Sequence, residues 1–234
     1  MLSKFKYRSY KTELLDLPNI PKEILYTNLY ELDLLNRTFG GHSITLQGIK
    51  QLVTDKNQTY HIVDLGCGSG DALKYIANWA KSNNFKVHLT GVDKNINAIN
   101  YLNEHCKDYP NIVGVVSDYH DFLKMANTID IIHCSLFCHH LKDDELLELL
   151  SIMKRNARRG FIINDLHRNW FAYYSVRYLT RLFNGSSLSK NDGPISVLRA
   201  FTSKELNSLL QKAQITNYTI NWKWAFRYLV VGKM

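Results

Sequence analysis

The sequence predicts an α/β protein built on a seven-stranded, doubly wound sheet, in which five parallel strands are closed by an antiparallel pair. Between residues 60 and 166, short apolar runs alternate with amphipathic helical patterns, as in a parallel sheet with helices on both faces. The last two apolar runs, 215–226 and 227–233, have only a short turn between them, so these strands must be antiparallel. N-terminal helices and an inserted aromatic lid complete the expected architecture.

The first 59 residues favour helices and are expected to form a cap. Pro21 stands near a predicted helix start, where its missing N–H costs nothing. One apolar stripe follows at helical spacing, formed by Ile24, Leu25, Leu29, Leu32 and Leu35. Gly40 and Gly41 are expected to end this helix.

The parallel strands are separated by helical segments, of which the strongest follows the fourth strand and ends at Gly160. The strands are expected at 60–66, 86–93, 111–118, 129–135 and 160–166. Residues 166–200 interrupt the alternation with an aromatic, basic helix and then a polar loop at 184–194. We predict that this insert is a lid at the carboxyl edge of the sheet. A capping box of Thr202 and Glu205 begins the last helix.

The composition limits the classes of function. The chain has 234 residues, 45% of them hydrophobic, and a formal net charge of +8. This charge favours anionic partners such as nucleic acid, acidic lipid or an acidic metabolite, but there is no compact basic block, so nucleic acid is an unlikely partner. The cysteines are Cys67, Cys106, Cys134 and Cys138, without a CxxC pair, and no signal peptide pattern or membrane-length apolar run occurs. Reduced thiols and a cytoplasmic location are expected.

A glycine-rich loop lies between the first strand and its helix. The segment VDLGCGSGD (63–71) has glycines at 66, 68 and 70, whereas the dinucleotide fingerprint would place a glycine where Asp71 stands. Asp64 and Asp71 flank the loop, which disfavours a pyrophosphate but suits a ligand with a cationic end. S-adenosylmethionine is such a ligand, because it carries an ammonium and a sulfonium and no phosphate.

The next two strands also end in acids. Asp93 could accept hydrogen bonds from both hydroxyls of a ribose, as in dinucleotide-binding folds. Asp118 could accept one from an adenine amino group. Three acids at successive strand ends beside a glycine loop predict a nucleoside cofactor.

The segment 63–71 resembles the first motif of class I S-adenosylmethionine-dependent methyltransferases, and residues 60–165 with the closing strand pair match that family's order of elements. The chain also resembles a narrower bacterial group that is linked to polyketide and quinone-like pathways. This likeness lies in NRTFGG (36–41), DLHRNWFAYY (165–174) and DGPISVLRAF (192–201). The resemblance implies a helical cap (1–59) and a methyltransferase domain (60–234) with its lid at 166–200.

The resemblance also implies the cofactor, S-adenosylmethionine with the product S-adenosylhomocysteine, and its site. Asp64 and Gly66 would hold the methionine end, Asp93 the ribose and Asp118 the adenine, and the backbone after the fourth strand would lie near the sulfonium. The full predicted set is Asp64, Gly66, Cys67, Gly68, Gly70, Asp93, Lys94, Asp118, Tyr119 and Cys134.

Methyl transfer to a phenol needs help with the proton, because a phenol has a pKa near ~10. The candidate bases are His139, His140 and His167, whereas His133 lies inside the fourth strand and is expected to be a packed core residue. CHHLKDDELLELL (138–150) resembles the CHDWSDE stretch of plant-type phenolic O-methyltransferases, whose base falls at His139. That family has Asp where this chain has His140, so the partner that orients the base stays open. His139 could also be a residue that caps the following helix, and His167 could pair with Asp165 or act as the base itself.

The sequence also indicates which residues contact the methyl acceptor and whether a metal is bound. The acceptor is expected to contact a set of aromatic and basic residues, namely Arg37, Trp170, Tyr173, Tyr174 and Arg199. The lid helix, with Arg177 and Arg181 at helical spacing, could instead make peripheral contact with an anionic membrane. No metal is expected at His133, Cys134, Cys138 and His139, because two of these side chains would point to opposite faces of a strand.

The predicted function is O-methylation of a hydroxylated aromatic or polyketide-derived small molecule with a histidine base. The alternatives are C-methylation of a quinone-type precursor, methylation of a nucleic acid such as RNA, and a catalytically silent protein that only binds the cofactor. The sequence leaves open the acceptor, the choice between oxygen and carbon, the identity of the base and the oligomeric state.

Overall fold

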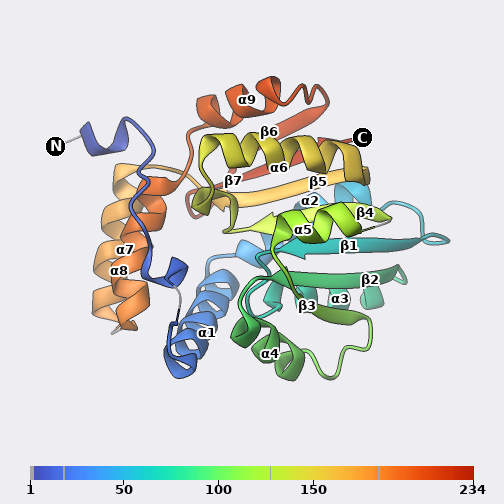
Figure 1. Ribbon diagram of the computed structural model, residues 1–234, viewed down its shortest axis with the longest axis horizontal. Helices are drawn as coiled ribbons and strands as arrows, with labels where there is room; N and C mark the ends of the chain where they lie inside the picture. Colours follow the sequence, from blue (N-terminus) through green and yellow to red (C-terminus); the bar gives the residue numbers. More distant parts are fainter. Residues whose placement is uncertain (1–2, 18, 127, 184) are drawn as a thin grey trace.

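The computed structural model describes residues 3–17, 19–126, 128–183 and 185–234. In this part of the chain a seven-stranded sheet has the order β3-β2-β1-β4-β5-β7-β6 (Figure 1). The strands are β1 (Thr59–Leu65), β2 (Lys86–Asp93), β3 (Ile112–Val116), β4 (Ile129–Ser135), β5 (Ala157–Leu166), β6 (Tyr218–Lys223) and β7 (Arg227–Lys233). The first five are parallel, and β7 runs antiparallel to both β5 and β6. The predicted fold class is confirmed.

Helices cover both faces of the sheet (Figure 1). They are α1 (Lys22–Thr38), α2 (Gly41–Leu52), α3 (Asp71–Ser82), α4 (Ile96–His105), α5 (Tyr119–Met125), α6 (Asp143–Asn156), α7 (Trp170–Leu182), α8 (Ser187–Arg199) and α9 (Ser203–Lys212). Side chains alternate between faces along each strand. Val63 and Leu65 of β1 therefore pack with α6 and α9, whereas Ile62 packs with α2, α3 and α4.

The N-terminal cap is helical only in part. Helix α1 begins directly after Pro21, and Gly40, with a φ of 77°, separates it from α2, as the sequence predicts. Before Pro21 the described chain is largely extended, with short 3-10 turns at Ser3–Phe5 and Leu14–Asp16, and it runs along α7 and α8 (Figure 1). Its backbone groups find partners there, because Ser9 N–H donates to the carbonyl of Leu198 at 2.9 Å.

The lid differs from its prediction in one element. The aromatic helix is present as α7, but the stretch 184–194 was expected to be a loop, and from residue 187 it is helix α8. Residue 184 lies outside the described residues. Ser186 caps α8, and Glu31 of α1 accepts hydrogen bonds from both the N–H and the hydroxyl of Ser186 at 2.7 Å. Partners from α1 therefore stabilise a helix whose local sequence disfavours one.

Candidate active site

A cavity of about 990 Å³ opens at the carboxyl ends of the parallel strands. The ends of β1, β2 and β3 contribute Asp64, Asp93 and Asp118 to its wall. This is the edge at which ligands bind open α/β sheets. The sequence therefore places its three acids around one cavity, although their roles there stay predictions.

The glycine loop lies against this cavity in a conformation that suits glycine. Gly66 has a φ of +67° and Gly70 a φ of +76°, in the left-handed region that other residues rarely adopt. A Cβ at Gly66 would overlap the ring of Phe137, and one at Gly70 would lie 2.8 Å from Leu102. Gly66 and Gly68 line the cavity, whereas Gly70 caps α3 behind it.

Asp93 is fixed by its own loop. Its Oδ1 accepts a hydrogen bond from the Asn95 N–H at 2.9 Å, and its Oδ2 accepts one from the Gly68 N–H at 3.2 Å. Burial raises the pKa of Asp93, while these hydrogen bonds act in the opposite direction. The carboxylate is thus oriented before any ligand arrives and links the glycine loop to the end of β2.

Asp64 has a partner that sequence reasoning missed. His133 is opposite Asp64 in the β1–β4 register, and its Nδ1 lies 2.7 Å from Asp64 Oδ1. The other ring nitrogen lies 3.1 Å from the hydroxyl of Thr45 in α2. His133 is fully buried, as the sequence predicts, but it also holds a cavity carboxylate. Both of its nitrogens have partners, so His133 has no nitrogen left for a metal.

Asp71 brings a buried carboxylate oxygen, beside His105, to the start of α3. Its Oδ1 is buried and makes no hydrogen bond within the described residues, and Nε2 of His105 is 3.2 Å away. The other carboxylate oxygen accepts a hydrogen bond from Ser69. Asp71 lines the same cavity as Asp64. A buried carboxylate oxygen without a donor favours a cationic group nearby.

The remaining predicted cofactor residues divide into two groups. Cys67, Lys94 and Tyr119 line the cavity, whereas Cys134 is buried within β4 and does not. The Tyr119 ring packs edge-on against Phe137 with 5.6 Å between centroids, and burial raises the pKa of Tyr119 to about 12. Asp118 is exposed and caps α5 by accepting from the His120 N–H at 2.8 Å.

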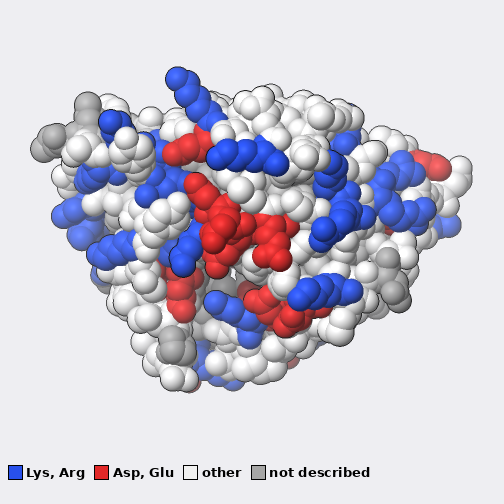
Figure 2. Space-filling view, turned by 45° about the horizontal axis from the view of Figure 1, so that its top comes forward, with Lys and Arg blue, Asp and Glu red and all other residues white. Residues whose placement is uncertain are grey.

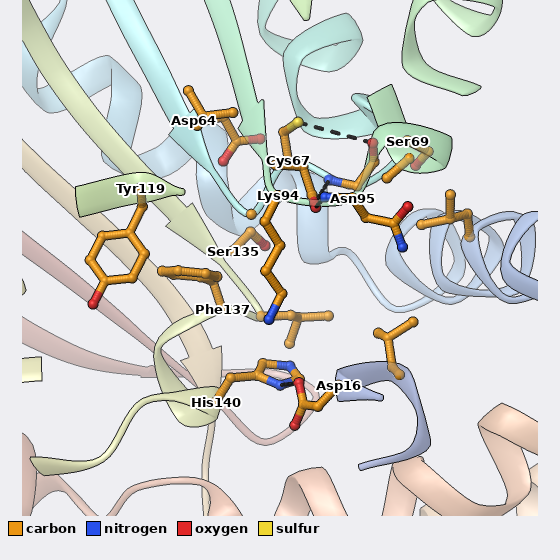
Figure 3. A pocket seen from close by; sticks show the side chains of 18 of the residues that line it. Asp16, Asp64, Cys67, Ser69, Lys94, Asn95, Tyr119, Ser135, Phe137 and His140 are labelled. Atoms are coloured by element: carbon orange, nitrogen blue, oxygen red, sulfur yellow. Dashed lines mark hydrogen bonds and ion pairs between the residues drawn. The ribbon is translucent and has the colours of Figure 1, made fainter. Parts of the chain in front are cut away.

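His140 borders the far end of the cavity. Its Nδ1 lies 2.8 Å from Oδ1 of Asp16, a residue of the N-terminal segment that also lines the cavity. Figure 3 shows Lys94 reaching across the cavity with its ammonium toward His140 and Asp16. Burial alone would raise the pKa of Asp16, but the hydrogen bonds and charges of His140 and Arg199 outweigh it and lower that pKa. Asp16 therefore stays ionised beside His140.

His139 and His167 do not line the cavity. His139 is only 3% exposed, and its Nδ1 lies 2.7 Å from Oδ1 of Asp165, whose Oδ2 accepts from the His139 N–H at 3.1 Å. Asp165 is thus the partner of His139 and not of His167. His167 instead accepts a hydrogen bond from the indole N–H of Trp222 at 3.3 Å. Burial and the nearby Arg168 charge lower the pKa of His167.

Residues 62–160 match a family described as a methyltransferase domain. Over this stretch the chain is similar to a methyltransferase domain. Its fold is shared with the plantazolicin methyltransferase BpumL, solved with S-adenosylhomocysteine, at a TM-score of 0.70 and 18% identity over 94% of this chain and 91% of that one. An S-adenosylmethionine-dependent methyltransferase from Aquifex aeolicus gives 0.62 and 18% over 92% and 99%.

A third structure with this fold is the magnesium protoporphyrin IX methyltransferase from Synechocystis, with a TM-score of 0.55 and 16% identity over 82% of this chain and 83% of that one. No curated protein sequence matches the chain. Among the described residues of the chain, no helix has the length and apolar character needed to cross a membrane.

The predicted acceptor residues lie elsewhere in the structure. None of the five lines the cavity. Arg37 pairs with Asp33, and Arg199 is buried, donating to Asp16 Oδ2 at 2.7 Å. On α7, Trp170 is half exposed, and Tyr173 is buried beneath the Lys4 ammonium, 3.7 Å from its ring centroid.

The N-terminal segment and α1 form the cavity wall that sequence reasoning missed. Apolar side chains from both line it, namely Leu15, Leu17, Ile20, Leu25, Leu29 and Leu32. The stripe of Leu25, Leu29 and Leu32 was visible in the sequence but could equally have served core packing. Residues 13–17 gave no periodic signal, because most of the segment before α1 is extended or forms a short turn.

Proposed function

We propose that the methyltransferase uses S-adenosylmethionine and methylates a hydroxyl oxygen of a small molecule, such as a hydroxylated aromatic or polyketide-derived compound. One observation carries the proposal. A single cavity extends from the glycine loop and the three strand-end acids to His140 and Asp16. It therefore offers a nucleoside site and a histidine–carboxylate pair within one cavity.

The residues at the glycine-loop end of the cavity fit the cofactor. Asp64 and the buried Oδ1 of Asp71 suit its cationic amino acid end. The fixed carboxylate of Asp93 suits ribose hydroxyls, and Asp118 with the Tyr119 ring suits adenine. The bound cofactor supplies a methyl group already activated on a sulfonium. The task left for the chain is to hold the acceptor in line and to exclude water.

The residues toward the His140 end of the cavity fit an apolar acceptor with one ionisable group. Leu15, Leu29 and Phe137 bring apolar surface into the cavity, which excludes water from the reacting atoms. At its end, His140 is the predicted base that borders the acceptor. When Nδ1–H is donated to Asp16, the lone pair of the ring stays on Nε2, the nitrogen that could take a proton.

The charge around the cavity disfavours nucleic acid as the acceptor. Asp118, Glu145 and Glu148 are exposed and line the cavity. Figure 2 shows acidic side chains gathered in the middle of this face, with Lys and Arg to both sides. A phosphate backbone would be repelled where its base must enter. The positive net charge therefore does not favour RNA at this site.

The proposal is tested with a panel of phenolic and polyketide-type acceptors, S-adenosylmethionine and mass spectrometry of the products. His140→Gln should lower turnover by about 10²-fold or more, the usual contribution of a general base, with little change in cofactor affinity. His88→Gln, which alters an exposed histidine in β2, should keep full turnover. NMR of the product separates O-methyl from C-methyl. Full turnover by His140→Gln, or methylation of RNA alone, would refute the proposal.

A further inference from the structure

We propose that Glu13, His139 and His140 bind a divalent transition-metal ion, and that their chemistry fits Zn²⁺ best. Glu13 lies in the N-terminal segment, directly before the turn Leu14–Asp16. The two histidines belong to a 3-10 turn, Cys138–His140, between β4 and α6. Two imidazoles and one carboxylate are a common ligand set of zinc sites that keep an open position.

The three ligand groups converge on one point. Nε2 of His139 lies 3.7 Å from Glu13 Oε1, and Nε2 of His140 lies 3.8 Å from Glu13 Oε2. One potential ligand atom from each residue lies within 4.8 Å of the other two. The two nitrogen–oxygen separations are too long for hydrogen bonds. They are close to the ~3.4 Å expected between two atoms that each bind a zinc ion at about 2.0–2.1 Å.

Glu13 gives an independent sign that a partner belongs here. Its side chain is 2% exposed, yet Oε1 makes no hydrogen bond within the described residues. Buried carboxylate oxygens are normally satisfied by donors or by metal ions. The structure places two imidazole nitrogens next to this carboxylate without hydrogen-bonding either of them to it, which is the arrangement a shared ion requires.

The outer nitrogens of both histidines are already engaged. Nδ1 of His139 lies 2.7 Å from Asp165, and Nδ1 of His140 lies 2.8 Å from Asp16. A carboxylate on the far nitrogen of a histidine is the usual support of a metal ligand, since it fixes the tautomer and turns the lone pair of the other nitrogen inward. Here both histidines have that support, and both Nε2 atoms lie toward Glu13.

Arg199 is a cation next to the proposed site. Its Nε lies 3.7 Å from Glu13 Oε1. The guanidinium, however, donates to Asp16 Oδ2 at 2.7 Å and to the backbone carbonyl of His140 at 2.7 Å. These hydrogen bonds hold Asp16 and the turn that carries the two histidines. Arg199 therefore supports a histidine-bearing loop and does not replace the ion.

This inference rests on the proposed function and deepens it. His140 lines the acceptor end of the cavity, so the ion would lie at that wall. An imidazole nitrogen bound to a metal cannot also take a proton. The ion, which lowers the pKa of a bound hydroxyl, would then replace direct proton transfer to His140. It would also tie the N-terminal segment, which walls the cavity, to the turn after β4.

The test is calorimetric titration of ZnCl₂ into the full chain after dialysis against EDTA, with Co²⁺ absorption spectra as a second readout. We expect one ion per chain with a spectrum typical of tetrahedral nitrogen and oxygen ligands. Glu13→Gln and His140→Ala should each weaken binding by at least about tenfold, and Asp165→Asn by about 10–100-fold. The matched controls Glu23→Gln and His88→Gln, at exposed positions, should bind as the wild type does.

The absence of Zn²⁺ binding, or binding that Glu13→Gln and His140→Ala leave unchanged, would overturn the inference. Circular dichroism confirms that each variant is folded. Cofactor binding and methyl transfer by the EDTA-treated chain are measured in parallel. Full transfer without any metal, lost in His140→Gln, would refute a role of the ion in the reaction but keep the proposed function. A chain that binds Zn²⁺ through these residues but not the cofactor would refute the proposed function alone.

Discussion

Asp165→Asn tests how the turn that carries His139 and His140 is held. Asp165 is 1% exposed. Its Oδ1 lies 2.7 Å from His139 Nδ1 and accepts from the Leu166 N–H at 2.7 Å, and its Oδ2 accepts from the His139 N–H at 3.1 Å. Asparagine keeps the shape but has a single oxygen and no charge, so at least one of these three contacts loses its acceptor and all three lose the negative charge. Hydrogen bonds to charged groups contribute about 1.5–3 kcal/mol each, so we expect a loss of about 3–5 kcal/mol in the free energy of unfolding.

The assay is urea unfolding followed by circular dichroism at pH 7. With a slope of roughly 2–3 kcal/mol per molar urea for a chain of this size, the midpoint should fall by at least about 1 M. Asp121→Asn, an exposed acid on α5, is the matched control and should change the free energy of unfolding by no more than about 0.5 kcal/mol. A midpoint for Asp165→Asn within the range of this control would refute the reasoning.

The difference in the free energy of unfolding between wild type and Asp165→Asn should depend on pH. Burial alone would raise the pKa of Asp165, but the charge and hydrogen bond of His139 outweigh it and lower that pKa. A depressed folded-state pKa contributes stability that is fully present above the unfolded value, near ~4, and is lost as pH falls through the folded value. The difference in free energy of unfolding between wild type and Asp165→Asn should therefore narrow below about pH 4. A constant difference down to pH 2 would contradict this sign.

Three further substitutions test other parts of the site. Gly66→Ala should weaken cofactor binding by at least about tenfold in calorimetry, because the new Cβ overlaps the Phe137 ring and the φ of +67° is strained for alanine; unchanged affinity would refute the role of the loop. Leu29→Ala should raise the acceptor KM more than it lowers kcat in steady-state kinetics, and an unchanged KM would place the acceptor elsewhere. Thr45→Val removes the hydroxyl 3.1 Å from His133 Nε2 and should cost about 1–3 kcal/mol in urea unfolding, whereas an unchanged midpoint would show that this contact contributes nothing.

The strand positions could be predicted because periodicity and glycine punctuation are local. The strand β4 was expected at 129–135 and occupies those residues, and the acids at the ends of β1, β2 and β3 meet at one cavity as parallel topology requires. The Asp64–His133 contact follows from strand order, which places β4 beside β1. The sequence showed both residues but not that their strands are neighbours.

The acceptor end could not be predicted because it depends on side-chain direction and on an extended segment. His139 and His140 are adjacent, yet within one 3-10 turn the first is buried against Asp165 and the second borders the cavity. No periodicity distinguishes the two. Glu13 and Asp16 are 120 or more positions earlier and reach the turn only because residues 3–17 cross the molecule along α8. Long-range placement of an extended segment has no local sequence signal.

The central claim is that the glycine loop and the acid at the end of β2 hold S-adenosylmethionine. Calorimetric titration of S-adenosylmethionine into the wild type and into Asp93→Ala tests it most directly. The account predicts one site per chain in the wild type and an affinity lowered by at least about tenfold in Asp93→Ala, because the carboxylate that Gly68 and Asn95 orient is removed. No binding to the folded wild type, or equal affinity in both proteins, would contradict it.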